Sequence, residues 1–384
     1  MAEFLDPEIL RTLNEAFNST NLFFQDSEQK QHFNLVCAVM DRISTCLEVL
    51  NENSEIPESE KDFIVFMVFG CILKDAVDNL IEELEIKENK NLKTTLFKEF
   101  CAEYNLTHKN KMLTDDEFIS YLRVLIFAHS TKTTDRKPNK PIVSCPFLIT
   151  KRNATKRGHV GVMIYPKGKP GMQAIEIPFV LLKKYISQYY ARINLATNKI
   201  KEIIGKYEQK WRQRKVNRDG SSSDILRNII SILEERFVEH YEFDDALCFL
   251  QTEISVQDKK NSVAKFKNAI AKKLPRICRC IDNLNHNEAI SLLDEVCNAR
   301  PSKIHSACMY QLEKIFCYLD KGIRSDNVIW GLRQAKEFSK QFARKWVTID
   351  TDNMSFEEIK LLVATACYCE REDQKRKELQ NEPV

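Results

Sequence analysis

Apolar residues recur at helical spacing over most of the N-terminal third of the chain. Within residues 27–51, Phe33, Val36, Met40 and Leu47 are three, four or seven positions apart, which places them on one face of a helix. The same pattern predicts further helices over about 6–18, 58–85 and 91–103, and one that begins at Thr114. This third of the chain is therefore expected to form a helical bundle.

The helix that begins at Thr114 has the strongest start signal. Thr114-Asp-Asp-Glu117 is a capping box, in which each end residue accepts a hydrogen bond from the backbone N–H of the other, and Leu113 and Phe118 can form a hydrophobic staple. The residues from 130 to 135, Ser-Thr-Lys-Thr-Thr-Asp, are poor helix formers. We therefore expect this helix to end near His129.

Proline and glycine divide residues 137–178 into short extended runs. The runs Ser144–Thr150, Val160–Tyr165 and Gln173–Ile177 predict a three-stranded antiparallel meander with basic loops, over about 142–178. Pro178 then opens a long, basic helix that is expected to reach about Val216.

Asn217-Arg-Asp-Gly-Ser-Ser-Ser-Asp224 is the clearest linker in the chain. It predicts two domains, residues 1–218 and 222–384. Beyond it, helices are expected over about 224–240, 259–281, 287–299, 302–320, 326–346 and 355–379. The predicted fold class is mainly α, with a helical bundle that carries a small inserted antiparallel β-meander, followed by a second all-helical domain whose role the sequence does not indicate.

Composition narrows the class of protein. With 43% hydrophobic residues the 384-residue chain can bury a large core, and its 9 glycines disfavour Gly-rich nucleotide folds. The 13 cysteines have no framework or zinc-finger spacing, and the N-terminus is acidic, so we expect reduced thiols, no metal or cofactor, and a cytoplasmic location. No run approaches the ~20 apolar residues of a membrane span, and paired acids such as Asp115-Asp116 are expected on solvated helix ends.

Charge is concentrated in the middle of the chain. Residues 1–130 carry a net charge of −12, residues 131–218 carry +17, and residues 219–384 carry −2. Such a basic segment indicates a nucleic-acid partner. The expected phosphate-binding residues are Lys132, Arg136, Lys137, Lys151, Arg152, Lys156 and Arg157. In the alternative, these charges dock on the acidic residues 1–130 or on an acidic protein. The aromatic residues Tyr185, Tyr189 and Tyr207 are expected to be core residues rather than base-stacking ones.

Arg123 and His129 are the candidate chemical pair. An arginine can hold a phosphate, and a histidine can transfer protons near neutral pH. An arginine followed by a histidine after four to six residues occurs four times in the chain, but only this pair lies on a strongly capped helix with an apolar spacer. In the alternative, Arg123 pairs with an acid such as Asp75 or Asp78, and His129 caps the helix.

The helix order and the Arg123/His129 pair resemble the HEPN superfamily of α-helical domains over about residues 27–135. Many members are dimeric, metal-independent ribonucleases of toxin–antitoxin, CRISPR and phage-defence systems. Catalytic members commonly carry Asn, Asp or His after the arginine, where this chain has Val124. A non-catalytic helical module that binds RNA or DNA, on a degenerate HEPN core, is therefore the alternative, and a protein-interaction scaffold is a third.

The resemblance implies a metal-independent endoribonuclease, acting as a toxin or anti-phage effector. Its expected partners are RNA, a second copy of the chain, and a protein trigger or antitoxin, but no membrane. Arg123 would stabilise charge on the phosphate and His129 would act as general acid/base. Positions six apart on a helix lie about 240° apart, so the pair needs a broken helix end or a second protomer to meet.

Overall fold

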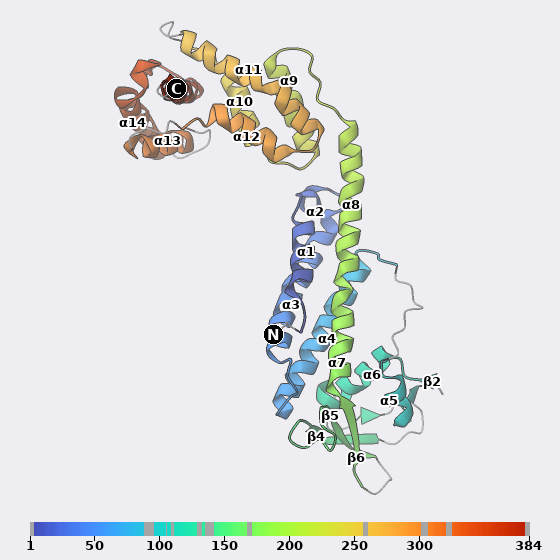
Figure 1. Ribbon diagram of the computed structural model, residues 1–384. Helices are drawn as coiled ribbons and strands as arrows, with labels where there is room; N and C mark the ends of the chain where they lie inside the picture. Colours follow the sequence, from blue (N-terminus) through green and yellow to red (C-terminus); the bar gives the residue numbers. More distant parts are fainter. Residues whose placement is uncertain are drawn as a thin grey trace. The chain divides into compact units, whose positions relative to one another are not determined.

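The chain divides into two compact units, Met1–Gly205 and Lys206–Val384, in the computed structural model (Figure 1). The structure describes residues 4–87, 96–104, 106–108, 111–128, 133–134, 142–166, 171–255, 260–300, 306–319 and 325–380. Both units are mainly helical, and an antiparallel sheet of four strands lies in the first. The predicted fold class is confirmed.

The helices of the first unit include the five predicted before the meander, and one short helix, Leu22–Gln25, was not predicted. They are α1 (Pro7–Phe17), α2 (Leu22–Gln25), α3 (Lys30–Glu52), α4 (Glu60–Glu83), α5 (Lys98–Glu103), α6 (Asp115–Arg123), α7 (Phe179–Ala191) and the start of α8 (Ile193–Gln213). Helix α4 packs against α3 and α7. A Cβ atom at Gly70 would lie 2.7 Å from Ile186 Cδ1, so this glycine allows α4 and α7 to approach closely.

The capping box that begins α6 is confirmed. Thr114 N–H donates to Glu117 Oε2 at 2.9 Å, and Glu117 N–H donates to Thr114 Oγ1 at 3.3 Å. Directly after Arg123 the chain continues as a π-helix, Val124–Ala128, with Leu125 and Ile126 buried. The helix therefore changes its hydrogen-bonding period immediately after the candidate arginine.

The predicted meander is present as β4 (Ile142–Ile149), β5 (His159–Pro166) and β6 (Gln173–Pro178). A two-residue strand, β3 (Thr133–Thr134), extends it to the order β3-β4-β5-β6, and β1 (Thr107–His108) pairs with β2 (Lys111–Met112) elsewhere. One face of the main sheet is buried and apolar. Its residues are Leu148, Val160, Val162, Ile164, Ile175 and Ile177.

The predicted continuous helix over 178–216 is wrong, because it is two helices. A tight turn separates α7 from α8, and the N–H of Arg192 there donates to Tyr189 O at 3.0 Å. The Arg192 side chain reaches Asp78 of α4 at 2.7 Å and lies over the Tyr189 ring at 4.7 Å. The ion pair with Asp78 fixes the turn against α4. Because Asp78 and Arg192 are distant in the sequence, a local pattern could not predict this contact.

The second unit contains the helical elements α9 (Ser222–Glu235), α10 (Tyr241–Gln251), α11 (Lys260–Asp282), α12 (His286–Cys297), α13 (Ser306–Tyr318), α14 (Ser325–Gln341), η2 (Ala343–Lys345) and α15 (Phe356–Gln380). Residues 361–369 of α15 are all buried, so this stretch is the central helix of the unit. Helix α10 was not predicted. At the start of α15, Glu358 N–H donates to Ser355 Oγ at 3.1 Å, and the Glu358 carboxylate accepts from the N–H and hydroxyl of Ser255 at 2.6 and 2.9 Å.

The predicted linker is exposed over residues 217–221, but hydrogen bonds and an ion pair tie it and the preceding Val216 to the second unit. Val216 is buried, its N–H donates to Asp282 Oδ1 at 2.8 Å, and Arg218 pairs with Asp282 Oδ2 at 2.7 Å. The two compact units divide after Gly205, inside α8. The polar composition of residues 217–224 predicted a linker. It could not predict the contacts of Val216 and Arg218 with Asp282, because these residues are distant in the sequence.

Asp115 is not on a solvated helix end. It is 4% exposed, and its two carboxylate oxygens accept from the backbone N–H groups of Leu96 and Phe97, both at 3.0 Å. It therefore caps the chain that enters α5.

Asp115→Ala should destabilise the first unit by about 1.5–3 kcal/mol, because one buried and one half-buried N–H group lose a charged acceptor. Hydrogen exchange should speed up most in residues 96–103. The exposed Asp41 of α3 supplies the control, and Asp41→Ala should change stability by less than about 0.5 kcal/mol. Equal effects of the two variants would show that Asp115 is not a structural cap.

Candidate nucleic-acid interface

The structure describes five of the predicted site residues, namely Arg123, Lys151, Arg152, Lys156 and Arg157. The other four, His129, Lys132, Arg136 and Lys137, lie outside the described residues. The predicted meeting of Arg123 with His129 therefore stays a prediction. The four described basic residues of the meander all lie on one loop, residues 150–158, which joins β4 to β5.

The β4–β5 loop is held by its own hydrogen bonds and by contacts with the start of α4. Thr150 N–H donates to Asn153 Oδ1 at 2.6 Å, and Asn153 Nδ2 donates to Leu148 O at 3.0 Å. Lys151 N–H donates to Pro57 O at 2.9 Å, which ties the loop to the residues before α4. Basic side chains on such a loop have a defined backbone from which to reach a ligand.

The other end of the loop is bound by Glu176 of β6. This carboxylate is 4% exposed and accepts from Thr155 N–H, Thr155 Oγ1 and Lys156 N–H at 3.0, 2.7 and 3.0 Å. Burial acts to raise the pKa of Glu176, but these hydrogen bonds outweigh it and lower the pKa below its usual value. Glu176 was not predicted as part of the site; the one signal is an acid in the apolar run Ala-Ile-Glu-Ile-Pro.

Three of the four basic side chains form ion pairs within the first unit. Glu58 pairs with Lys151 at 2.8 Å and with Arg152 at 3.6 Å, and Lys156 pairs with Glu103 at 3.5 Å. The hydrogen bond from Lys151 lowers the pKa of Glu58. The alternative expectation, that basic residues dock on the acidic N-terminal region, is thus met at these positions.

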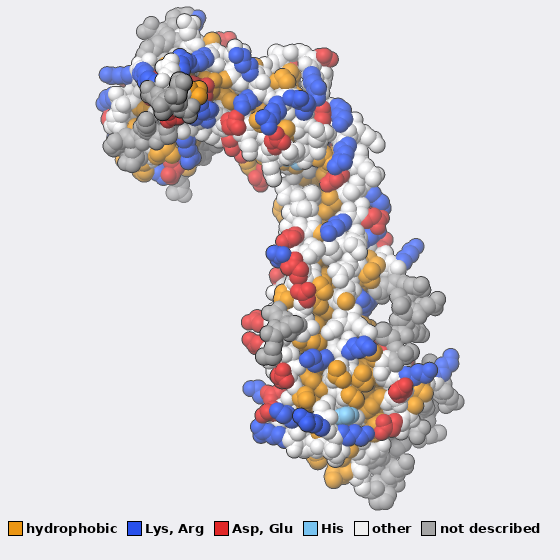
Figure 2. Space-filling model, in the orientation of Figure 1, with side chains coloured by type: hydrophobic (Ala, Val, Ile, Leu, Met, Phe, Trp, Pro, Cys, Tyr) orange, Lys and Arg blue, Asp and Glu red, His pale blue; other side chains and the backbone are white. Residues whose placement is uncertain are grey.

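These ion pairs are exposed and leave the cations accessible. The side chains of Lys151, Arg152 and Lys156 are 57%, 73% and 53% exposed, and Arg157 is exposed without an ion pair to any described residue. An exposed ion pair contributes only about 0–1 kcal/mol to stability, so a phosphate can replace the carboxylate as the partner of the cation. Figure 2 shows Lys and Arg side chains beside Asp and Glu over the part of the first unit that carries the sheet.

Arg123 lies away from this loop in the chain, at the end of α6, where it contacts α4 and the π-helical segment Val124–Ala128. Its Nη1 lies 3.7 Å from Asp75 Oδ2, its guanidinium lies 5.9 Å from the Phe127 ring, and its side chain is 49% exposed. The ion pair is the one that the non-catalytic interpretation predicts. The half-exposed guanidinium also retains donors that can reach a ligand from solvent.

A polar cluster adjoins Arg123 on the same helices. Asp78 binds Lys74 at 2.6 Å and Arg192 at 2.7 Å. Asp116 accepts from the hydroxyls of Tyr185 and Tyr189, both at 2.6 Å. Burial, and then Asp116, raises the pKa of both tyrosines, so their hydroxyls stay protonated donors.

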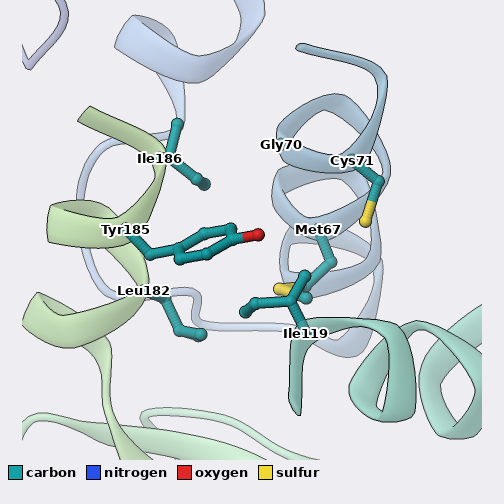
Figure 3. A pocket seen from close by; sticks show the side chains of 7 residues that line it. All are labelled: Met67, Gly70, Cys71, Ile119, Leu182, Tyr185 and Ile186. Atoms are coloured by element: carbon teal, nitrogen blue, oxygen red, sulfur yellow. The ribbon is translucent and has the colours of Figure 1, made fainter. Parts of the chain in front are cut away.

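The predicted core role of the tyrosines holds for Tyr185, which is 2% exposed, whereas Tyr189 and Tyr207 are half-buried. Tyr185 borders a cavity between α4, α6 and α7, and Figure 3 shows its ring among Met67, Leu182 and Ile186. The cavity volume is about 10 Å³, which is room for about one water molecule. A substrate at Arg123 would therefore bind on the surface.

No group of three or more His, Cys, Asp or Glu side chains is arranged to hold a metal ion among the residues that the structure describes. Within the same residues, no helix combines the length and apolar character needed to cross a bilayer. No family model, curated protein or solved structure matches the chain. Any function must therefore be argued from the two surfaces themselves.

Proposed function

We propose that the first unit binds RNA through the β4–β5 loop. The observation that carries this proposal is the display of four basic, exposed side chains on one hydrogen-bonded loop of nine residues. The loop belongs to the segment 131–218, whose net charge of +17 exceeds what solubility requires. Phosphates bind such side chains largely without regard to base sequence.

Binding should depend steeply on salt, and the loop should supply much of that dependence. Replacing Lys151, Arg152, Lys156 and Arg157 together by glutamine should weaken RNA binding at least about tenfold at low salt. The slope of log K against log salt should fall by about 3, since each phosphate contact on a single strand contributes about 0.7. Fluorescence anisotropy with a labelled RNA at several salt concentrations measures both quantities.

The matched control removes the same number of charges from the second unit. Lys265, Lys272, Arg279 and Arg333 are all exposed there. Replacing them by glutamine changes the net charge equally and should change the salt slope by less than about 1. If both sets of substitutions weaken binding alike, attraction is a general charge effect and the loop is not the site. If wild type binds no RNA, the proposal fails.

The second candidate function is RNA cleavage at Arg123 and His129. Two observations favour it: Arg123 is half exposed, and the chain forms a π-helix directly after it. π-Helical turns are frequent at functional sites. In the proposed reaction, a ribose 2′-oxygen attacks the adjacent phosphorus while His129 accepts its proton. The bond to the 5′-oxygen breaks, that oxygen takes a proton, and a 2′,3′-cyclic phosphate and a 5′-hydroxyl remain.

This second proposal includes the HEPN relationship and its biological setting. The protein would then act in the cytoplasm as a toxin or anti-phage effector, with a protein trigger or antitoxin as partner. A homodimer would bring Arg123 of one protomer and His129 of the other to one phosphate. Val124, after Arg123, is the departure that makes the non-catalytic RNA-binding module the alternative.

A further inference from the structure

The outer face of the main sheet carries aromatic side chains. Phe147 of β4 pairs with Met163 of β5, so their side chains share a face, and Tyr165 lies two residues further along the same face. Phe147 is 37% exposed and Tyr165 is 44% exposed, whereas Val162 and Ile164 of the opposite face are buried. The two side chains are thus partly exposed on neighbouring strands, whereas Ile149 and Glu176, on the same face but nearer the β4–β5 loop, are buried.

The register brings the two aromatic residues close together. Cross-strand partners and their diagonal neighbours lie within about 8 Å of each other in an antiparallel sheet, which is within the reach of aromatic side chains. Met172, just before β6, is a further exposed apolar residue, at 55%. Single exposed apolar residues are normal on a protein surface, but adjacent rings on one sheet face form a larger platform.

The basic loop borders this platform. Glu176, which binds Thr155 and Lys156 of the loop, lies on the same outer face, two residues from Ala174, the partner of Met163. The backbone of Lys156 therefore contacts the outer face at the buried Glu176, one row of side chains away from Phe147 and Met163. Cations next to exposed rings match a polymer that has phosphates next to flat bases.

We propose that the exposed part of the outer face of β4 and β5 stacks unpaired bases on Phe147 and Tyr165 while the β4–β5 loop holds the phosphates. This inference rests on the proposed RNA binding and adds that the RNA is single-stranded. Every base has a π-face, so the platform is tolerant of base sequence. A duplex hides its base faces in its own stack and gains only the phosphate contacts.

The test compares two labelled probes of equal length and charge, a single-stranded 12-nucleotide RNA and an abasic RNA analogue, by fluorescence anisotropy. Wild type should bind the base-bearing probe at least about tenfold more tightly. Tyr165→Ala and Phe147→Ala should each weaken binding of that probe about 5- to 100-fold and leave the abasic probe and the salt slope unchanged. Tyr165→Phe keeps the ring and should bind as wild type does.

Tyr241 supplies the matched control, because it is 70% exposed in the second unit, and Tyr241→Ala should leave both probes unaffected. Circular dichroism and thermal melts confirm that each variant is folded. If both probes bind alike and the aromatic variants bind as wild type, the platform is overturned while binding by the basic loop stands. If neither probe binds, the proposed RNA binding itself fails, and the platform with it.

Discussion

Arg236→Met should destabilise the second unit by at least about 3 kcal/mol. Arg236 is 1% exposed, and its guanidinium donates to Ile281 O at 2.7 Å, Trp211 O at 2.9 Å and Arg214 O at 3.2 Å. These carbonyls lie at the ends of α8 and α11, where helices have acceptors without an intrahelical partner. Methionine fills much of the same volume but donates no hydrogen bond.

The destabilisation expected for Arg236→Met is large because the lost group is charged as well as hydrogen-bonded. Burial lowers the pKa of Arg236 to about 10, so the group remains a cation at neutral pH, and nearby Asp282 partly offsets the effect. A cation is stabilised by the negative ends of helix dipoles. Hydrogen bonds from charged donors contribute about 1.5–3 kcal/mol each, and contributions that share one side chain do not simply add.

Hydrogen exchange on the full chain measures this prediction, because peptides report on each unit separately. Exchange should accelerate around residues 211–216, in α9 and at the end of α11, and remain unchanged in residues 30–83. Arg227→Met is the matched control, since Arg227 lies on the surface of α9, the helix that ends directly before Arg236, and pairs there with Asp224 at 2.7 Å. Equal exchange in the two variants would show that water satisfies the carbonyls once the guanidinium is gone.

Local signals predicted the elements of the first unit. Helical spacing identified α3 and α4, the Thr114 capping box identified the start of α6, and alternation bounded by proline and glycine identified the strands of the meander. Each of these depends on residues within one turn or one strand. The turn at Arg192 and the packing of Val216 on Asp282 depend on contacts between distant residues, so local patterns could not predict them.

The same distinction applies to the candidate sites. Charge alone predicted that Lys151, Arg152 and Lys156 lie on an exposed loop, because desolvating so many unpaired cations is unfavourable. It did not identify Glu58 and Glu103 as their partners, since those residues are about 93 and 53 positions away in the chain. Asp115 was placed wrongly for a related reason: its N–H partners precede α5, about 18 residues earlier.

Arg123→Ala and His129→Ala should each slow RNA cleavage by at least about a hundredfold, if the second proposed function is right. Loss of a general acid/base costs about 10²–10⁴ in rate, and loss of a donor to developing charge costs about 10²–10³. The assay follows a labelled RNA in excess EDTA, with and without candidate triggers. The product ends should be a 2′,3′-cyclic phosphate and a 5′-hydroxyl, and RNA binding should remain unchanged.

Asp75→Asn separates a catalytic Arg123 from a structural one. Asp75 is 58% exposed and lies 3.7 Å from Arg123, so the amide removes the ion pair with little loss of volume. If Arg123 is catalytic, its release from this carboxylate should leave the cleavage rate of Asp75→Asn unchanged or raise it. If the ion pair is only structural, Asp75→Asn and Arg123→Ala should lower the cleavage rate equally. A wild type that binds RNA but cuts none under any trigger would contradict the nuclease and leave the binding module, because the loop 150–158 does not depend on Arg123.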